Sequence, residues 1–244
     1  MVFKIKLAEK IIEIHSRYEW VYNLCNSYIV REDYYPDIFI ETDTQDIEFE
    51  KAIIRKKISP DYQIELSFLE SHAIYRKIAD AMISFDTILM HGSAISTKGN
   101  GYMIVAGSGV GKTLRSNLWI ETIPESYILN GDKPLLRVLK DNVTIYGTPW
   151  CGKEGKNRND KSTLKAIFFL ERAYYEEKTS VTEINLREAL PALLLQTYFS
   201  SKSEDFIKII KLFEIMGENV KFYKFRSTPT AESVCLAYET VNKI

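Results

Sequence analysis

The fold is decided by one stretch, Ala106-Gly107-Ser108-Gly109-Val110-Gly111-Lys112-Thr113. An apolar run at residues 102–105 precedes it and a segment with helical spacing follows it, which predicts a strand-to-helix turn. The stretch matches the P-loop pattern, with Ala106 in place of the first glycine. Glycines allow the backbone to approach a phosphate chain. Successive N–H groups and the positive end of the following helix then offer donors to anionic oxygens.

The pattern predicts a nucleotide site for ATP and Mg²⁺. We expect Lys112 to reach the β- and γ-phosphates and the Thr113 hydroxyl to ligate magnesium. The candidate nucleotide-binding residues are Gly107, Ser108, Gly109, Val110, Gly111, Lys112 and Thr113. The alternative is a glycine-rich turn that matches the pattern without binding a nucleotide. The joint presence of glycine, lysine and threonine between a strand and a helix favours the nucleotide site.

The composition is that of an ordinary globular protein. Of 244 residues, 45% are hydrophobic and 27% are charged, and the formal net charge of −1 argues against a nucleic-acid or membrane-surface partner. The three cysteines are far apart and form no CxxC pair, so neither a disulfide framework nor a zinc site is predicted. Residues 1–7 alternate apolar with polar side chains rather than forming a signal peptide, and no run could span a bilayer. These features predict a cytoplasmic protein.

Residues 1–84 are expected to form a small α+β unit. Alternation predicts strands at residues 3–7 and 12–14, and Ser16 is the expected N-cap of a helix that buries Trp20. A helical period returns from about residue 70 to 84. Further strands are expected at residues 38–41, 47–49, 52–54 and 62–66.

Residues 85–244 are expected to form the main domain, a mixed α/β sheet. An apolar strand runs into His91-Gly92-Ser93-Ala94, and a turn at residues 98–101 leads back into the strand before the glycine-rich stretch. A β-hairpin directly before a P-loop differs from the simple βαβ arrangement. Later strands are expected at residues 127–130, 135–139, 143–146, 164–170, 181–184 and 220–225, with helices after Thr113, at 186–198, around 206–213 and from 231.

Two further features are candidates for chemistry. Asp132 follows an apolar strand, where an acidic residue commonly provides a second magnesium contact, although an aspartate in a turn fits the same pattern. A basic, glycine-bearing loop carries Lys153, Lys156 and Arg158. This loop fits a lid over a triphosphate and a solvated surface equally well.

From about His91 to the C-terminus, the chain resembles the HPr kinase family and, more distantly, the phosphoenolpyruvate carboxykinases. The resemblance lies in the order of three blocks: His91 to Ala94, Ala106 to Thr113, and the strand that ends at Asp132. It implies nucleotide roles for Lys112 and Thr113, a base and metal contact at Asp132, and a phosphate-adjacent histidine at His91.

The chain departs from that family at two points. Gly131-Asp132 stands where the family commonly has adjacent aspartates, and the glycine-rich C-terminal signature of authentic HPr kinase/phosphorylases is absent. The resemblance is therefore to shorter HPr-kinase-related proteins rather than to a typical HPr kinase.

The sequence thus predicts an ATP- and magnesium-dependent kinase with Lys112, Asp132 and His91 as catalytic residues. The expected acceptor is a serine of a peptide or small protein, and a homo-oligomer is compatible with the composition. The first alternative is a catalytically weak ATP-binding module whose occupancy regulates partner docking. A second alternative is a structural relative whose N-terminal unit binds a peptide.

Overall fold

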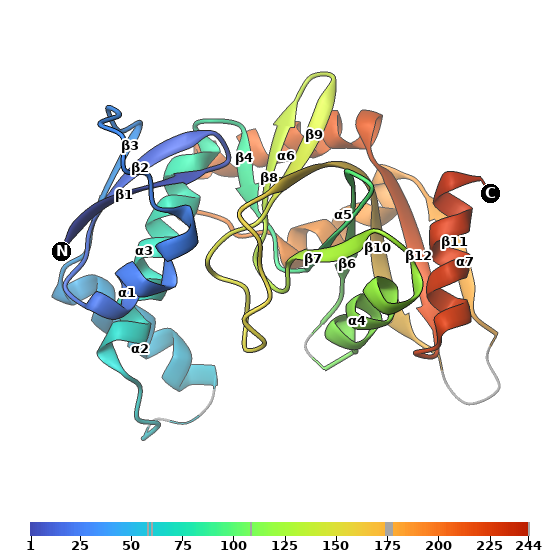
Figure 1. The fold of residues 1–244 in the computed structure, drawn as a ribbon, viewed down its shortest axis with the longest axis horizontal. Coiled ribbons are helices and arrows are strands. Elements are labelled where there is room, and N and C mark those ends of the chain that lie inside the picture. Colours follow the sequence, from blue (N-terminus) through green and yellow to red (C-terminus); the bar gives the residue numbers. More distant parts are fainter. Residues whose placement is uncertain (58, 60, 108, 174–177, 244) are drawn as a thin grey trace. The chain divides into compact units, whose positions relative to one another are not determined.

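The computed structural model describes residues 1–57, 59, 61–107, 109–173 and 178–243. The chain forms two compact units, Met1–Ser84 and Phe85–Ile244 (Figure 1). Within the described ranges, no helix combines the length and the apolar character needed to cross a bilayer.

The first unit contains a three-stranded sheet with the order β1-β2-β3. The antiparallel hairpin of β1 (Val2–Leu7) and β2 (Lys10–His15) turns through Ala8 and Glu9, and β3 (Ile38–Glu41) runs parallel to β2. The helical elements are α1 (Glu19–Leu24), the 3₁₀ turn η1 (Asn26–Tyr28), α2 (Thr44–Lys57) and α3 (Leu66–Ile83). Alternating apolar residues therefore identified all three strands of this sheet.

The strands expected at residues 47–49 and 52–54 are wrong, because this segment is helix α2. Its inward stripe includes the buried Ile47 and Glu50 and the half-buried Ile54, which follow helical spacing. Glu50 is a carboxylate between the apolar residues of this stripe. This charged residue interrupts the helical spacing of apolar residues, so the sequence shows only short apolar runs of the kind that predict strands.

Two other expectations for the first unit also fail. Residues 62–65 form no strand, and Tyr62 and Leu66 remain exposed. Ser16 does not cap α1, and Trp20 is 43% exposed. Instead, the buried Glu70 of α3 accepts hydrogen bonds from the Ser16 hydroxyl and from the backbone N–H groups of residues 17 and 18. Glu70, distant in sequence, thus holds the segment just before α1, while the N-cap residue Tyr18 makes no side-chain capping bond.

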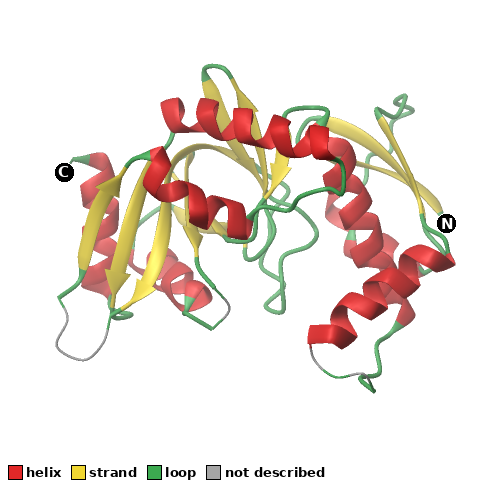
Figure 2. Cartoon of the chain, turned by 180° about the vertical axis from the view of Figure 1, so that it is seen from behind, coloured by secondary structure: helices red, strands yellow, loops and turns green. Residues whose placement is uncertain are grey.

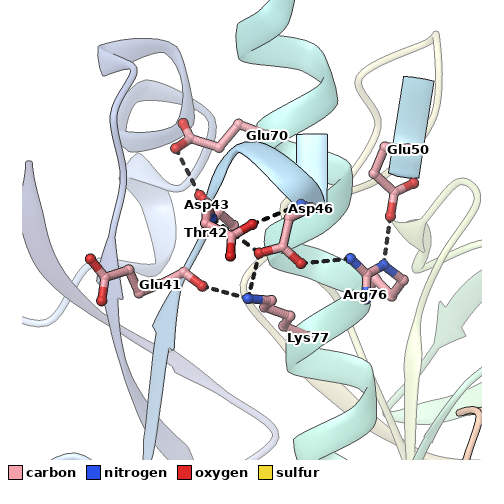
Figure 3. Close-up of polar contacts among 8 residues, drawn as sticks. All are labelled: Glu41, Thr42, Asp43, Asp46, Glu50, Glu70, Arg76 and Lys77. Carbon is pink, nitrogen blue, oxygen red and sulfur yellow. Dashed lines mark hydrogen bonds and ion pairs between the residues drawn. The ribbon is translucent and has the colours of Figure 1, made fainter. Parts of the chain in front are cut away.

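A polar network joins α2 to α3 in the first unit (Figure 3). The Asp46 carboxylate contacts Arg76 at 3.0 Å and Lys77 at 2.5 Å, while Arg76 also contacts Glu50 at 2.6 Å. Lys77 donates a further hydrogen bond to the carbonyl oxygen of Glu41. Burial raises the pKa of Asp46, but the hydrogen bond from Lys77 and the other donors outweigh burial and lower the pKa below 3.8.

We expect this network to make α2 sensitive to acid. A carboxyl group whose pKa is lowered in the folded state stabilises that state above its unfolded pKa, and this contribution is lost as the pH falls through the folded value. Asp46→Asn should therefore speed hydrogen–deuterium exchange in α2 at pH 7, and the difference from the wild type should shrink as the pH falls through the lowered pKa of Asp46. The measurement is mass spectrometry of both proteins at the same pH.

Glu48→Gln is the control, because Glu48 lies on the same helix and, among the described residues, pairs with the nearby Lys51 alone. Equal exchange of Asp46→Asn and Glu48→Gln at pH 7 would contradict a stabilising role for the Asp46 network.

The second unit is built on a mixed nine-stranded sheet, which agrees with the expected mixed α/β class. Its main path has the order β4-β8-β9-β10-β6-β5-β7, and β12 pairs with both β10 and β11. The long strand β10 (Lys161–Arg172) runs parallel to β6 (Asn100–Val105) on one side and to β12 (Lys221–Ser227) on the other. The remaining strands are β4 (Thr87–Leu89), β5 (Ser93–Thr97), β7 (Ser126–Asn130), β8 (Leu135–Leu139), β9 (Asn142–Tyr146) and β11 (Ser180–Ile184).

In the described part of this unit, the helices are α4 (Lys112–Thr122), α5 (Leu186–Gln196), α6 (Ser203–Asn219) and α7 (Ala231–Asn242). On one face of the sheet, Trp119 of α4 and Val234 of α7 pack with Phe168 of β10 and Phe225 of β12 in a single buried cluster. Figure 2 shows α5 and α6 on the opposite face. Aromatic and aliphatic packing therefore holds the helix that follows the glycine-rich stretch firmly against the sheet.

The structure confirms the expected hairpin of β5 and β6 and the later strands and helices of this unit. It corrects one detail, because the apolar strand before the hairpin is not continuous. β4 ends at Leu89 and β5 begins at Ser93, so His91 lies in the short break between two strands. This break exposes a histidine that a continuous strand would have placed in the sheet.

Candidate functional site

The glycine-rich loop, residues 106–111, connects β6 to α4, as the sequence predicts. Gly109 has φ +78° and Gly111 has φ +107°, conformations that side chains with a Cβ rarely adopt. Ala106 is buried in the cluster between the sheet and α4, so an apolar methyl group suits the first position of the loop. Val110 also packs against this cluster, whereas Ser108 lies outside the described residues.

Lys112 occupies the first turn of α4 and folds back along the loop. Its Nζ donates to the carbonyl oxygen of Ala106 at 3.0 Å. Burial lowers the pKa of Lys112, and the negative charge of Asp132 partly opposes this effect. The lysine is therefore held between the loop and the carboxylate at the end of β7.

Asp132 is fixed through its backbone and its side chain. Its carbonyl oxygen accepts from the N–H of Gly92 at 2.9 Å, and its Oδ1 lies 3.2 Å from Nε2 of His91. Burial raises the pKa of Asp132, but the hydrogen bond from His91 and the charge of Lys133 outweigh burial and hold the pKa below the usual value of an aspartate. The carboxylate is ionised at neutral pH.

His91 is held on its other side by the last residue of α5. Its Nδ1 lies 2.7 Å from Oε1 of Gln196, and its backbone N–H donates to the carbonyl oxygen of Gln196 at 2.7 Å. The imidazole is thus oriented between an amide and a carboxylate. A histidine with both ring nitrogens engaged keeps one ring orientation.

Asn130, the last residue of β7, sets the turn that presents Asp132. Its fully buried Oδ1 accepts from the backbone N–H groups of Asp132 at 2.8 Å and Lys133 at 2.7 Å. Its Nδ2 donates to the carbonyl oxygen and to the hydroxyl of Thr148, both at 3.0 Å. This arrangement is an Asx turn anchored to a neighbouring loop.

Gly131 has no room for a side chain. A Cβ at this position would lie 2.8 Å from the carbonyl oxygen of Cys151. Backbone contact is therefore a physical reason why a second acidic residue does not precede Asp132 in this chain.

We expect Gly131→Ala to lower the free energy of unfolding of the second unit by about 1–3 kcal/mol, because the new methyl group must displace backbone. Gly107→Ala is the matched control, since the nearest atom to its Cβ would be the Val110 Cγ2 at 3.9 Å. Urea unfolding of both variants checks the difference. Equal free energies of unfolding for the two variants would show that the backbone at Cys151 moves away from position 131 at little cost in stability.

The expected catalytic residues meet in one cavity of about 500 Å³. His91, Asp132, Lys112 and Thr113 all line it, together with Gly109 and Gly111. Of the other expected nucleotide-binding residues, Gly107 and Val110 do not line this cavity. The remaining lining residues are Ser93, Ser116, Ile128, Gly131, Cys151, Gly152, Lys153, Glu154 and Lys156.

The basic loop divides into two parts. Lys153 and Lys156 line the cavity, and Lys156 contacts Glu154 at 3.2 Å and donates to Oδ1 of Asn117 at 2.8 Å. Arg158 lies elsewhere, with its guanidinium carbon 4.1 Å from the centroid of the Tyr127 ring. Backbone hydrogen bonds tie Lys156 to Gly131 and Arg158 to Leu129 of β7, so these two residues of the expected lid are anchored beside the end of that strand.

The donors for a metal ion are few. In the part of the chain that the structure describes, no three His, Cys, Asp or Glu side chains gather as a metal cluster. The oxygen donors that line the cavity include Glu154, which is paired with Lys156, and the expected pair, the Thr113 hydroxyl and the Asp132 carboxylate. Such a pair fits a magnesium ion whose other ligands are phosphate oxygens and water, not a dedicated protein site.

Asn130 and Gln196 are the positioning residues that sequence reasoning missed. Asn130 directly precedes Gly131-Asp132, so its capacity for an Asx turn was a readable signal. Gln196 is 105 residues from His91, and no local pattern connects the two.

Comparison with known proteins adds little to this geometry. No family model and no curated protein matches the chain. Among solved structures, the HPr(Ser) kinase/phosphatase from Coxiella burnetii is similar, with 12% identity, a TM-score of 0.36, and coverage of 64% of this chain and 88% of that chain. A match at this level carries no argument about activity, which depends on the site itself.

Proposed function

We propose that this protein is an ATP- and Mg²⁺-dependent kinase of the HPr-kinase-like type that transfers the γ-phosphate to a hydroxyl group, a serine of a peptide or small protein. The observation that supports the proposal is the meeting of Lys112 and Thr113 with the His91–Asp132 pair in one cavity. The first two residues have the chemistry to bind a polyphosphate, and the pair has the chemistry to orient an acceptor.

Phosphoryl transfer depends mainly on positioning and on neutralisation of charge. In our proposal, Lys112 leaves the carbonyl oxygen of Ala106 and binds the β- and γ-phosphates, while the loop amides and the N-terminus of α4 bind the other oxygens. Thr113 and Asp132 would hold a magnesium ion, which would supply positive charge beside the phosphates.

Asp132 is the proposed acceptor-orienting group and base. Its Oδ1 is engaged by His91, and Oδ2 has no hydrogen-bond donor among the residues described. Its lowered pKa makes it a weak base, which suits a loose transition state in which the acceptor loses its proton late. His91 fixes the carboxylate and stands beside the transferring phosphate.

The first test is phosphoryl transfer from γ-labelled ATP to a library of serine-containing peptides, with magnesium present. Lys112→Ala should weaken ATP binding about 10- to 100-fold through loss of a charge-assisted hydrogen bond. Asp132→Asn should keep ATP binding within a fewfold of the wild type and lower transfer by about 100-fold or more. Calorimetry gives the binding constants.

Lys165→Ala is the matched control, since Lys165 is exposed on β10 and does not line the cavity. No ATP binding by the wild type, or equal binding by Lys112→Ala, would refute the proposal. Tight ATP binding with no transfer to any peptide would favour the alternative, a module whose nucleotide occupancy regulates docking of a partner.

A second test concerns the orientation of His91. Gln196→Met keeps the length of the side chain but removes the hydrogen-bond acceptor for Nδ1, and we expect about tenfold slower transfer, equivalent to about 1.4 kcal/mol. The KM for ATP should stay unchanged, because Gln196 does not line the cavity. Leu195→Met, at a neighbouring and 80% exposed position, is the control. An unchanged rate for Gln196→Met would show that His91 needs no support from α5.

A further inference from the structure

Two arginines lie against the glycine-rich loop, and the proposed function does not use them. Arg115 is on α4, one turn after Gly111, and is 3% exposed. Its Nη1 donates to the carbonyl oxygen of Val110 at 3.2 Å and its Nη2 to that of Ser227 at 2.6 Å. Its Nε is buried without a hydrogen-bond partner among the described residues.

Arg172, the last residue of β10, holds the neighbouring carbonyl group of the loop. Its Nη2 donates to the carbonyl oxygen of Gly109 at 3.1 Å. It reaches the loop because β6, β10 and β12 are parallel, so their carboxyl ends meet at one edge of the sheet. Two guanidinium groups thus hold the carbonyl oxygens of consecutive loop residues.

The contact of Arg115 with the loop orients a peptide group. In a trans peptide, a carbonyl group and the N–H of the next residue point in opposite directions. Holding the carbonyl of Val110 on the side of Arg115 therefore directs the N–H of Gly111 the other way. Gly111 also leaves space for the guanidinium, because a Cβ there would lie 2.3 Å from Nη1 of Arg115.

Among the residues that the structure describes, these two arginines have no carboxylate partner. Within the described ranges, no carboxylate lies within ion-pair distance of Arg115 or Arg172, whereas the adjacent Glu171 pairs with Arg226. Burial, and then the charge of Arg172, lower the pKa of Arg115. Two cations of like charge beside a loop with phosphate-binding chemistry are a reason to expect an anion there.

We propose that Arg115 and Arg172 are positioning residues of the nucleotide site, which fix the glycine-rich loop through its carbonyl groups and whose combined charge is balanced by bound polyphosphate. This inference rests on the proposed function. The arginines do not touch the phosphates. The two arginines orient the loop amides and add positive potential behind these amides. The repulsion between the two guanidinium groups is relieved when the polyanion binds.

The test uses Arg172→Gln in the full-length chain, because Arg172 is exposed and its replacement leaves the core intact. The probes are Mg²⁺–ATP and inorganic tripolyphosphate, measured by calorimetry. We expect both to bind about three- to tenfold more weakly, as loss of one partly screened charge near a polyanion predicts. The melting temperature without ligand should stay the same or rise, because one member of a repelling pair is gone.

Two further variants separate positioning from general effects. Arg226→Gln makes the same charge change on the neighbouring strand, but Arg226 pairs with Glu171 and should leave both affinities unchanged. Arg172→Lys keeps the charge and should restore the affinity for tripolyphosphate to within about twofold of the wild type.

Equal binding by Arg172→Gln and Arg226→Gln would overturn this inference while leaving the proposed kinase intact. A lower melting temperature of ligand-free Arg172→Gln, with affinity lost in proportion, would also overturn it, because that result indicates a purely structural role. Failure of the wild type to bind either probe would instead refute the proposed function on which the inference depends.

Discussion

Parallel pairing along β10 is the constraint on which the second unit depends. Because β10 lies between β6 and β12 in parallel, three carboxyl ends meet at one edge of the sheet. The glycine-rich loop leaves β6 there, and Arg172 and Ser227 are at the ends of the other two strands. Trp119 and the buried aromatic cluster hold α4 against this sheet, so the loop has a rigid support on both sides.

The opposite side of the cavity depends on hydrogen bonds to backbone. Asn130 shapes the turn that carries Asp132, Gly92 donates to the backbone of Asp132, and Gln196 orients His91. The backbone at Gly131 lies so close to the carbonyl oxygen of Cys151 that a residue with a side chain does not fit at position 131.

In the first unit, buried charged side chains interrupt the apolar pattern from which helices are predicted. Glu50 and Glu70 occupy inward positions on α2 and α3 because Arg76, hydroxyl groups and backbone N–H groups satisfy them. A carboxylate in the buried stripe interrupts the apolar period, and α2 was mistaken for strands as a result. The expected cap at Ser16 also fails, because the Ser16 hydroxyl donates to Glu70, a glutamate more than fifty residues away.

The sequence by itself determined the features that depend on near neighbours in the chain. The strand-loop-helix order around Lys112, the hairpin before it, and Asp132 at a strand end all follow from alternation, helical spacing and glycine chemistry. Only the tertiary structure decided which distant side chains complete these features. Three contacts depend on the order of strands in the sheet and on the path of the chain, which no local pattern encodes. They join Gln196 to His91, Arg172 to Gly109 and Arg158 to the ring of Tyr127. Local preferences act over a few residues, whereas a site is assembled by packing between segments far apart in sequence.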